Sequence, residues 1–179
     1  MLFRSFNYGS MGTSIGHEIM HNFNLVGKNF DANAVYNEMW LGEEWGRQYL
    51  ERASCLRQHY NNSEILLYKD GKAIKTNLKN NASQTWEEDL VDNEGMKLSL
   101  RAYRTYMKKH GPEARFAHKE DFNSDQVFFI GWAFHHCTAY SMEGLEYDLK
   151  NDVHSINQLR VALVNYRNIW SVIITGYLH

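Results

Sequence analysis

The chain has 179 residues, enough for one domain with a hydrophobic core, and its 44% hydrophobic and 22% charged residues are typical of a globular protein. Its formal net charge is −2 and it has no basic block, which argues against nucleic-acid binding. Met1–Phe6 is too short and polar for a signal peptide, and the longest apolar run, residues 169–178, is half the roughly 20 residues needed to span a membrane.

The first part of the chain predicts two helices. Ser10 is a candidate N-cap for a helix from about Met11 to Asn22. Residues 24–33, rich in Asn and Gly, are expected to form a loop. Apolar residues then recur at three-to-four spacing over residues 34–60, which predicts a long amphipathic helix whose apolar side faces the core.

The middle of the chain combines a polar stretch with a second long helix. Residues 61–82 are irregular, apart from a brief strand expected at Ile65–Tyr68 and a turn at Asp70-Gly71. A helix is expected over residues 84–109. Its first part is acidic, which the helix dipole favours, and Gly111 and Pro112 follow its end.

The last part predicts two more helices. Ser124 is a candidate cap for an apolar, buried helix from Asp125 to about Ser141. Residues 142–156 are expected to form a loop, and a final helix is expected from Asn157 to about Trp170. No repeat or linker interrupts the sequence, so residues 1–179 are predicted to form a single domain, mainly α-helical, with four to five helices and little sheet.

A metal-binding motif lies in the first predicted helix. His17, Glu18 and His21 form the pattern H-E-x-x-H. Residues four apart lie on one face of a helix, so the two imidazoles can bind one ion, and Glu18 can act on a water bound to it. The spacing predicts half of a zinc site together with a general base.

A catalytic zinc site needs a third protein ligand, and the acidic helix offers candidates. Glu88 is favoured because Asp92 lies four residues later on the same face and can accept a hydrogen bond from a ligand histidine. Glu87 is the alternative, but position 91 is Val and offers no such partner.

Three segments together resemble one known family. The first contains residues 7–12, 15–21 and 27–30 around the H-E-x-x-H motif. The second, residues 88–95, is similar to the pattern E-N-x-A-D-N-G-G and is followed by residues 101–103. The third is Asp152–Ser155, with Arg160 six residues after His154. In this order and spacing, they resemble the neprilysin and endothelin-converting-enzyme family of zinc metallopeptidases.

The resemblance implies a fold, a metal and an activity. The fold would be the helical C-terminal part of a thermolysin-like (gluzincin) catalytic domain, a truncated form of that domain. One zinc ion would be bound by the ligands His17, His21 and Glu88. Glu18 would be the general base of a metalloendopeptidase that hydrolyses short peptides.

The remaining roles also follow from the resemblance. Asp92 would orient a ligand histidine, and His154 would stabilise the developing oxyanion. Asp152 would hold His154 in place, and Arg160 would bind a backbone carbonyl of the substrate. Family members are largely cell-surface or secreted proteins, which implies the same location for this chain.

The chain departs from the family pattern at several positions. Asp89, Val91 and Glu94 replace Asn, Ala and Gly of the third-ligand segment. The family's substrate-pairing edge strand precedes the zinc helix and lies outside this sequence, so association with an N-terminal half is expected. The resemblance implies that the partners of Cys55 and Cys137 are also absent, which leaves both thiols unpaired.

Two alternatives to an active peptidase remain. One is a catalytically impaired zinc-binding fragment or paralogue that binds peptides or partner chains without turnover. The other is a structural helical domain whose histidines bind no metal. The sequons at Asn61 and Asn81 match the N-x-S/T pattern, which is common by chance and does not establish secretion.

Overall fold

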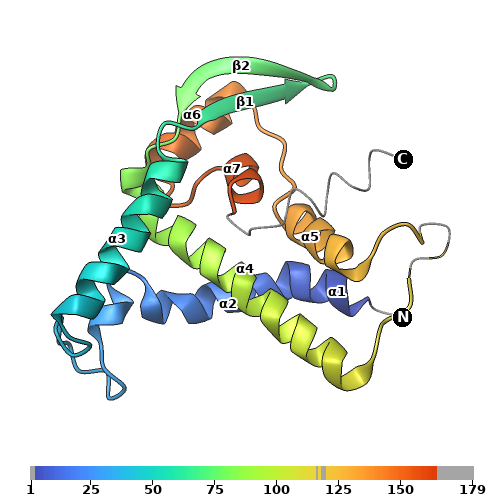
Figure 1. Cartoon of the computed structure of the whole chain (residues 1–179). Coiled ribbons are helices and arrows are strands. Elements are labelled where there is room, and N and C mark those ends of the chain that lie inside the picture. Colours follow the sequence, from blue (N-terminus) through green and yellow to red (C-terminus); the bar gives the residue numbers. More distant parts are fainter. Residues whose placement is uncertain (1–2, 116, 118–119, 165–179) are drawn as a thin grey trace. The chain divides into compact units, whose positions relative to one another are not determined.

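The computed structural model describes residues 3–115, 117 and 120–164 (Figure 1). These residues are mainly helical, with one two-stranded sheet, which confirms the predicted fold class. The chain divides into two compact units. The first contains residues up to Ile19 and Asp92–Cys137, and the second contains Met20–Val91 and Thr138–Leu163. The expectation of a single domain stays a prediction.

The N-terminal helical run starts earlier than predicted. It comprises α1 (Arg4–Asn7), the π-helical turn η1 (Tyr8–Gly12) and α2 (Thr13–Met20). Ser10 is not a cap, because its hydroxyl donates to the Phe6 carbonyl 2.9 Å away, within the run. The carboxylate of Glu113 instead accepts the first free N–H groups, from Arg4 at 2.9 Å and Ser5 at 3.2 Å. A residue from a distant segment therefore starts this helix.

In the first unit, α1 and η1 pack against α5 (Ser124–His135). A Cβ atom on Gly9 would lie 1.9 Å from the Phe128 carbonyl oxygen, so only glycine permits this approach. The cap of α5 is Asn123, which forms a capping box with Gln126, rather than the predicted Ser124. The helix ends at His135, six residues before the predicted end.

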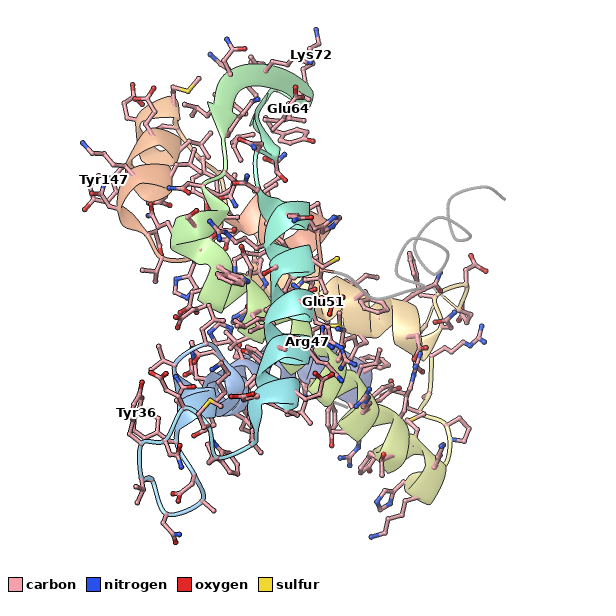
Figure 2. The ribbon with its side chains drawn as sticks, turned by 60° about the vertical axis from the view of Figure 1, so that its left-hand side comes forward. Tyr36, Arg47, Glu51, Glu64, Lys72 and Tyr147 are labelled. Carbon is pink, nitrogen blue, oxygen red and sulfur yellow. The ribbon has the colours of Figure 1, made fainter. Side chains whose placement is uncertain are left out.

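In the second unit, two 3₁₀ turns, η2 (His21–Phe23) and η3 (Gly27–Asn29), precede α3 (Glu43–Tyr60). The predicted helix start at residue 34 is wrong: Ala34 and Gly42 have φ angles of 58° and 86°, which a right-handed helix cannot contain. The outer face of α3 is charged, and Figure 2 shows Arg47 and Glu51 on it, joined by an ion pair of 3.4 Å.

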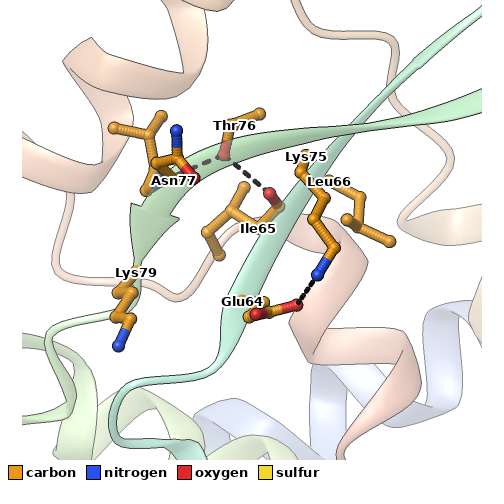
Figure 3. A pocket seen from close by; sticks show the side chains of 8 residues that line it. Glu64, Ile65, Leu66, Lys75, Thr76, Asn77 and Lys79 are labelled. Atoms are coloured by element: carbon orange, nitrogen blue, oxygen red, sulfur yellow. Dashed lines mark hydrogen bonds and ion pairs between the residues drawn. The ribbon is translucent and has the colours of Figure 1, made fainter.

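The antiparallel hairpin of β1 (Glu64–Lys69) and β2 (Lys72–Lys79) confirms the predicted strand and turn, but β2 was not predicted. A bulge interrupts the pairing near Asn77, whose φ is 61°. There the Thr76 hydroxyl donates a 2.6 Å hydrogen bond to the backbone carbonyl of Ile65, as Figure 3 shows. This side-chain bond takes the place of a backbone hydrogen bond between the two strands at the bulge. Around the bulge is a cavity of about 300 Å³.

The remaining helices are α4 (Ala82–His110), α6 (Met142–Asn151) and α7 (Asn157–Ala162). The structure confirms α4. The loop predicted over residues 142–156 is wrong for its first part, where the Ser141 side chain caps α6. Figure 1 shows the hairpin beside α6 and α7, and a core of Ile65, Leu145, Ile156 and Leu159 joins these elements. The last predicted helix begins at Asn157 as expected but ends at Ala162, in α7. The part of that prediction beyond residue 164, and the apolar run of residues 169–178, lie outside the described residues.

The described residues also bear on the expectations for membrane spans and for the two cysteines. In the described part of the chain, no helix combines the length and apolar character needed to cross a bilayer. Cys55 and Cys137 are both exposed and form no disulfide among these residues.

Candidate metal centre

In the first unit, His17 is held by a carboxylate. Its Nδ1 atom lies 2.8 Å from Oδ1 of Asp92, and both side chains are buried, with His17 7% and Asp92 2% exposed. The backbones of α2 and α4 meet here, since a Cβ atom on Gly16 would lie 2.4 Å from the Gly95 carbonyl oxygen. With Nδ1 bonded to Asp92, Nε2 is the nitrogen that can bind a metal ion.

In the second unit, His21 and Glu88 lie together. Nε2 of His21 is 3.5 Å from Oε2 of Glu88. Glu87 points elsewhere: its Oε2 accepts a hydrogen bond of 3.0 Å from Nδ2 of Asn24. Of the two candidate third ligands, Glu88 is thus the one whose carboxylate contacts a histidine of the motif.

His154 contacts the same carboxylate. Its Nε2 atom lies 3.2 Å from Oε2 of Glu88, and its Nδ1 atom lies 2.9 Å from Oδ1 of Asp152. The hydrogen bond to Glu88 raises the pKa of His154, and the bond to Asp152 adds to this effect although burial opposes it. Burial raises the pKa of Asp152, but the backbone and ring N–H groups of His154 outweigh it and hold this pKa below its usual value.

Arg160 lies on α7, close to His154. Both line a cavity of about 210 Å³, together with Asp152, Tyr140 and Asn157. The Tyr140 hydroxyl accepts a 3.3 Å hydrogen bond from the Asn157 backbone, which fixes the first residue of α7. An imidazole and a guanidinium, both donors to carbonyl oxygens, therefore line one polar cavity.

The structure brings most of the predicted site residues into two groups. His17 and Asp92 form one pair within the first unit. Glu88, His21, His154 and Asp152 form a contiguous set within the second unit. Glu18, on α2, is exposed.

The donor set suits zinc. Imidazole nitrogen and carboxylate oxygen are the ligands that zinc takes in catalytic sites. In the first unit the Asp92 contact uses Nδ1 of His17, and in the second unit Nε2 of His21 faces the Glu88 carboxylate. The chemical types of these side chains therefore fit those that zinc takes as ligands.

Some neighbours of the site were not predicted. The buried Asn24 has its Nδ2 atom 3.2 Å from Nδ1 of His21, while its Oδ1 accepts the N–H groups of Val26 and Gly27. Asn24 stands three residues after His21, and this spacing is the one signal that could have identified it. Thr85 and Ser155 contact each other across 70 residues of sequence, a separation that no local pattern encodes.

Comparisons with known proteins give a consistent result. The model of peptidase family M13 matches residues 2–169. Neprilysin-1 of Caenorhabditis elegans is 35% identical over 162 residues, which are 90% of this chain and 20% of that protein. Human neprilysin is 32% identical over 157 residues, 88% of this chain and 20% of that protein. The chain thus spans about a fifth of the length of these relatives.

Solved structures share the fold. The zinc metalloprotease Zmp1 of Mycobacterium tuberculosis, in complex with an inhibitor, superposes with a TM-score of 0.77 at 22% identity, covering 98% of this chain and 25% of that one. The Haemonchus galactose-containing glycoprotein complex superposes with a TM-score of 0.76 at 26% identity, covering 90% of this chain and 25% of that one.

Proposed function

The chain belongs to peptidase family M13, and from this premise we propose that it is the zinc-binding segment of a metalloendopeptidase that cleaves short peptides. The observation that supports this most is the pair of contacts at Glu88, whose Oε2 atom faces Nε2 of both His21 and His154. In such a site, one imidazole beside the carboxylate binds the cation with it, and this is the role we propose for His21. The other imidazole donates a hydrogen bond to the substrate, and this is the role we propose for His154.

We assign the metal to His17, His21 and Glu88. When bound, zinc supplies Lewis acidity and lowers the pKa of a coordinated water. Asp92 accepts the Nδ1 proton of His17 and so keeps Nε2 of that ring unprotonated for the metal.

The other residues act on the substrate and on protons. Glu18, exposed on α2, takes a proton from the attacking water and delivers it to the leaving amine. His154, oriented by Asp152, donates from Nε2 to the oxygen that becomes negative as the peptide carbonyl is attacked. Arg160 binds a backbone carbonyl of the peptide next to the scissile bond.

Location follows from the same proposal. The relatives named above are neprilysins, and we place this chain, like them, at the cell surface or outside the cell. Peptides are the proposed substrates.

Turnover of an internally quenched apolar peptide tests the activity. The wild-type chain should cleave it, a chelator should abolish cleavage, and Glu18→Gln should lower kcat by at least about 100-fold while one zinc per chain is retained. Glu51→Gln, an exposed carboxylate on α3, is the matched control and should cleave normally. Cleavage that survives both the chelator and Glu18→Gln would refute the mechanism.

The alternative is a zinc-binding module that binds peptides or partner chains without turnover. It predicts one zinc per chain and no cleavage by the wild type at any enzyme concentration. Elemental analysis beside the peptide assay separates the two readings.

A further inference from the structure

Four buried polar side chains form one hydrogen-bonded chain in the second unit. Asn80, Thr85, Asp89 and Ser155 are 1–4% exposed. Nδ2 of Asn80 lies 3.2 Å from the Ser155 hydroxyl, which lies 3.1 Å from the Thr85 hydroxyl, which lies 2.7 Å from Oδ2 of Asp89. The set joins the base of the hairpin, the start of α4 and the segment that carries His154.

The direction of donation in this chain is set by its two ends. A carboxylate oxygen can only accept, so the single hydroxyl proton of Thr85 goes to Asp89. The Thr85 oxygen then accepts the proton of Ser155 and also faces Nδ2 of Asn80, 3.3 Å away, while the Ser155 oxygen accepts from the same amide. Removal of the Thr85 hydroxyl would therefore deprive both Asp89 and Ser155 of a partner, in a region closed to water.

Two residues at the start of α4 hold the two flanks of His154. On one side Ser155 is bonded to Thr85. On the other side the Asp152 carbonyl accepts a 2.5 Å hydrogen bond from Nε2 of Gln84. Gln84 and Thr85 belong to the first turns of α4 and lie four and three residues before Glu88, the spacing at which residues share a helix face.

We propose that Thr85 is a positioning residue: through Ser155, it holds His154 at the distance from Glu88 that oxyanion stabilisation requires. The inference rests on the proposed function for the role of His154, but the anchoring itself does not. Asp152 orients the ring through Nδ1, and Thr85 fixes the backbone that carries the ring. Placement of a donor to within a fraction of an ångström is what makes it effective in a transition state.

Backbone hydrogen exchange tests the anchoring without any need for activity. In Thr85→Val, the amides of residues 153–157 should exchange about 10-fold faster than in the wild type, while Thr85→Ser, which keeps the hydroxyl, should match the wild type. Thr105→Val is the matched control. Thr105 is also on α4, but it is exposed, and its hydroxyl donates to the Arg101 carbonyl within the same helix, so this variant should exchange normally.

Kinetics test the positioning role. Thr85→Val should lower kcat about 10-fold or more with KM and zinc content unchanged, and Thr85→Ser should restore kcat. If Thr85→Val fails to fold, Ser155→Ala removes the same contact from the other side and leaves the Thr85–Asp89 bond intact.

The outcomes separate the two proposals. Unchanged exchange at residues 153–157 in Thr85→Val and Ser155→Ala would overturn the anchoring. Faster exchange with unchanged kcat would overturn the positioning role. A wild-type chain that binds zinc but cleaves nothing would refute the proposed peptidase activity, and with it the catalytic role of Thr85, while the exchange data would still decide whether Thr85 anchors the segment.

Discussion

Nδ1 of His17 lies 2.8 Å from Oδ1 of Asp92, and both side chains are buried. This contact ties the H-E-x-x-H helix to α4. It also selects the tautomer of His17 in which Nε2 carries no proton, the form that a metal ion needs.

Asp92→Asn should therefore weaken zinc binding. The amide keeps the shape of the side chain but removes its charge and allows the opposite tautomer, so zinc affinity should fall about 10- to 100-fold. Competition with a fluorescent chelator measures the affinity. Asp125→Asn, which changes an ion pair with Arg104 away from the histidines, should leave it unaltered. Equal affinity in Asp92→Asn and wild type would show that the contact does not serve the metal.

The third ligand can be identified by comparing two adjacent carboxylates. Glu88 faces His21 and His154, whereas Glu87 bonds Asn24. Glu88→Ala should abolish stoichiometric zinc binding, because two histidines alone hold the ion weakly, and Glu87→Ala should retain it. Zinc titration of the two variants beside the wild type decides the assignment, and retained affinity in Glu88→Ala would refute it.

Replacing a helical glycine by alanine should have opposite effects at Gly16, where α2 and α4 meet, and at Gly46, which lies in open space. In Gly16→Ala the new methyl would lie 2.4 Å from the Gly95 carbonyl oxygen, so the helices must separate, at a cost of about 1–3 kcal/mol. In Gly46→Ala, on α3, nothing lies within 4 Å of the new methyl, and stability should rise by about 0.5–1 kcal/mol. Urea unfolding of both variants measures these changes; a Gly16→Ala variant as stable as wild type would contradict the packing.

The helix α4 and the hairpin turn could be predicted because each depends on residues that are close together in the sequence. The acidic start and the Gly111-Pro112 ending are typical of a helix over residues 84–109, where α4 lies, and Asp70-Gly71 predicted the hairpin turn, at positions where the φ angles are 51° and 73°. Similarly, the four-residue offset of Glu88 and Asp92 led to the expectation of a carboxylate beside a histidine of the motif. The structure has that contact between Asp92 and His17.

Features that depend on distant contacts could not be predicted in this way. The helix start at Arg4 relies on Glu113, which lies 109 residues later, so the local sequence pointed to Ser10 as a cap instead. The strand β2 pairs with β1, and its own sequence, with Lys72 and Lys79 at its ends and Asn77 inside, gives only a weak strand signal. The contact of Thr85 with Ser155 likewise exists only once the chain has folded.

The hydrogen bonds to the Glu113 carboxylate predict how the stability of the first unit changes with pH. Burial raises the pKa of this carboxyl group, but hydrogen bonds from Ser5, Tyr103 and Arg4 outweigh burial and hold the pKa below its usual value. The folded state thus favours the ionised form. The stabilisation is complete above the pKa of the unfolded chain, about 4.3, and is lost as the pH falls through the lower pKa of the folded chain.

Glu113→Gln should therefore lower the free energy of unfolding by about 1 kcal/mol at pH 7, a modest value because the group is partly exposed. The difference from wild type should shrink as the pH is lowered from 6 to 3, because the wild-type carboxylate becomes protonated over this range while the amide does not titrate. Urea unfolding at a series of pH values measures both curves. Glu120→Gln, an exposed carboxylate in the following loop, is the control. A difference that stays constant or grows toward acid pH would show that the Glu113 charge does not hold the start of the helix.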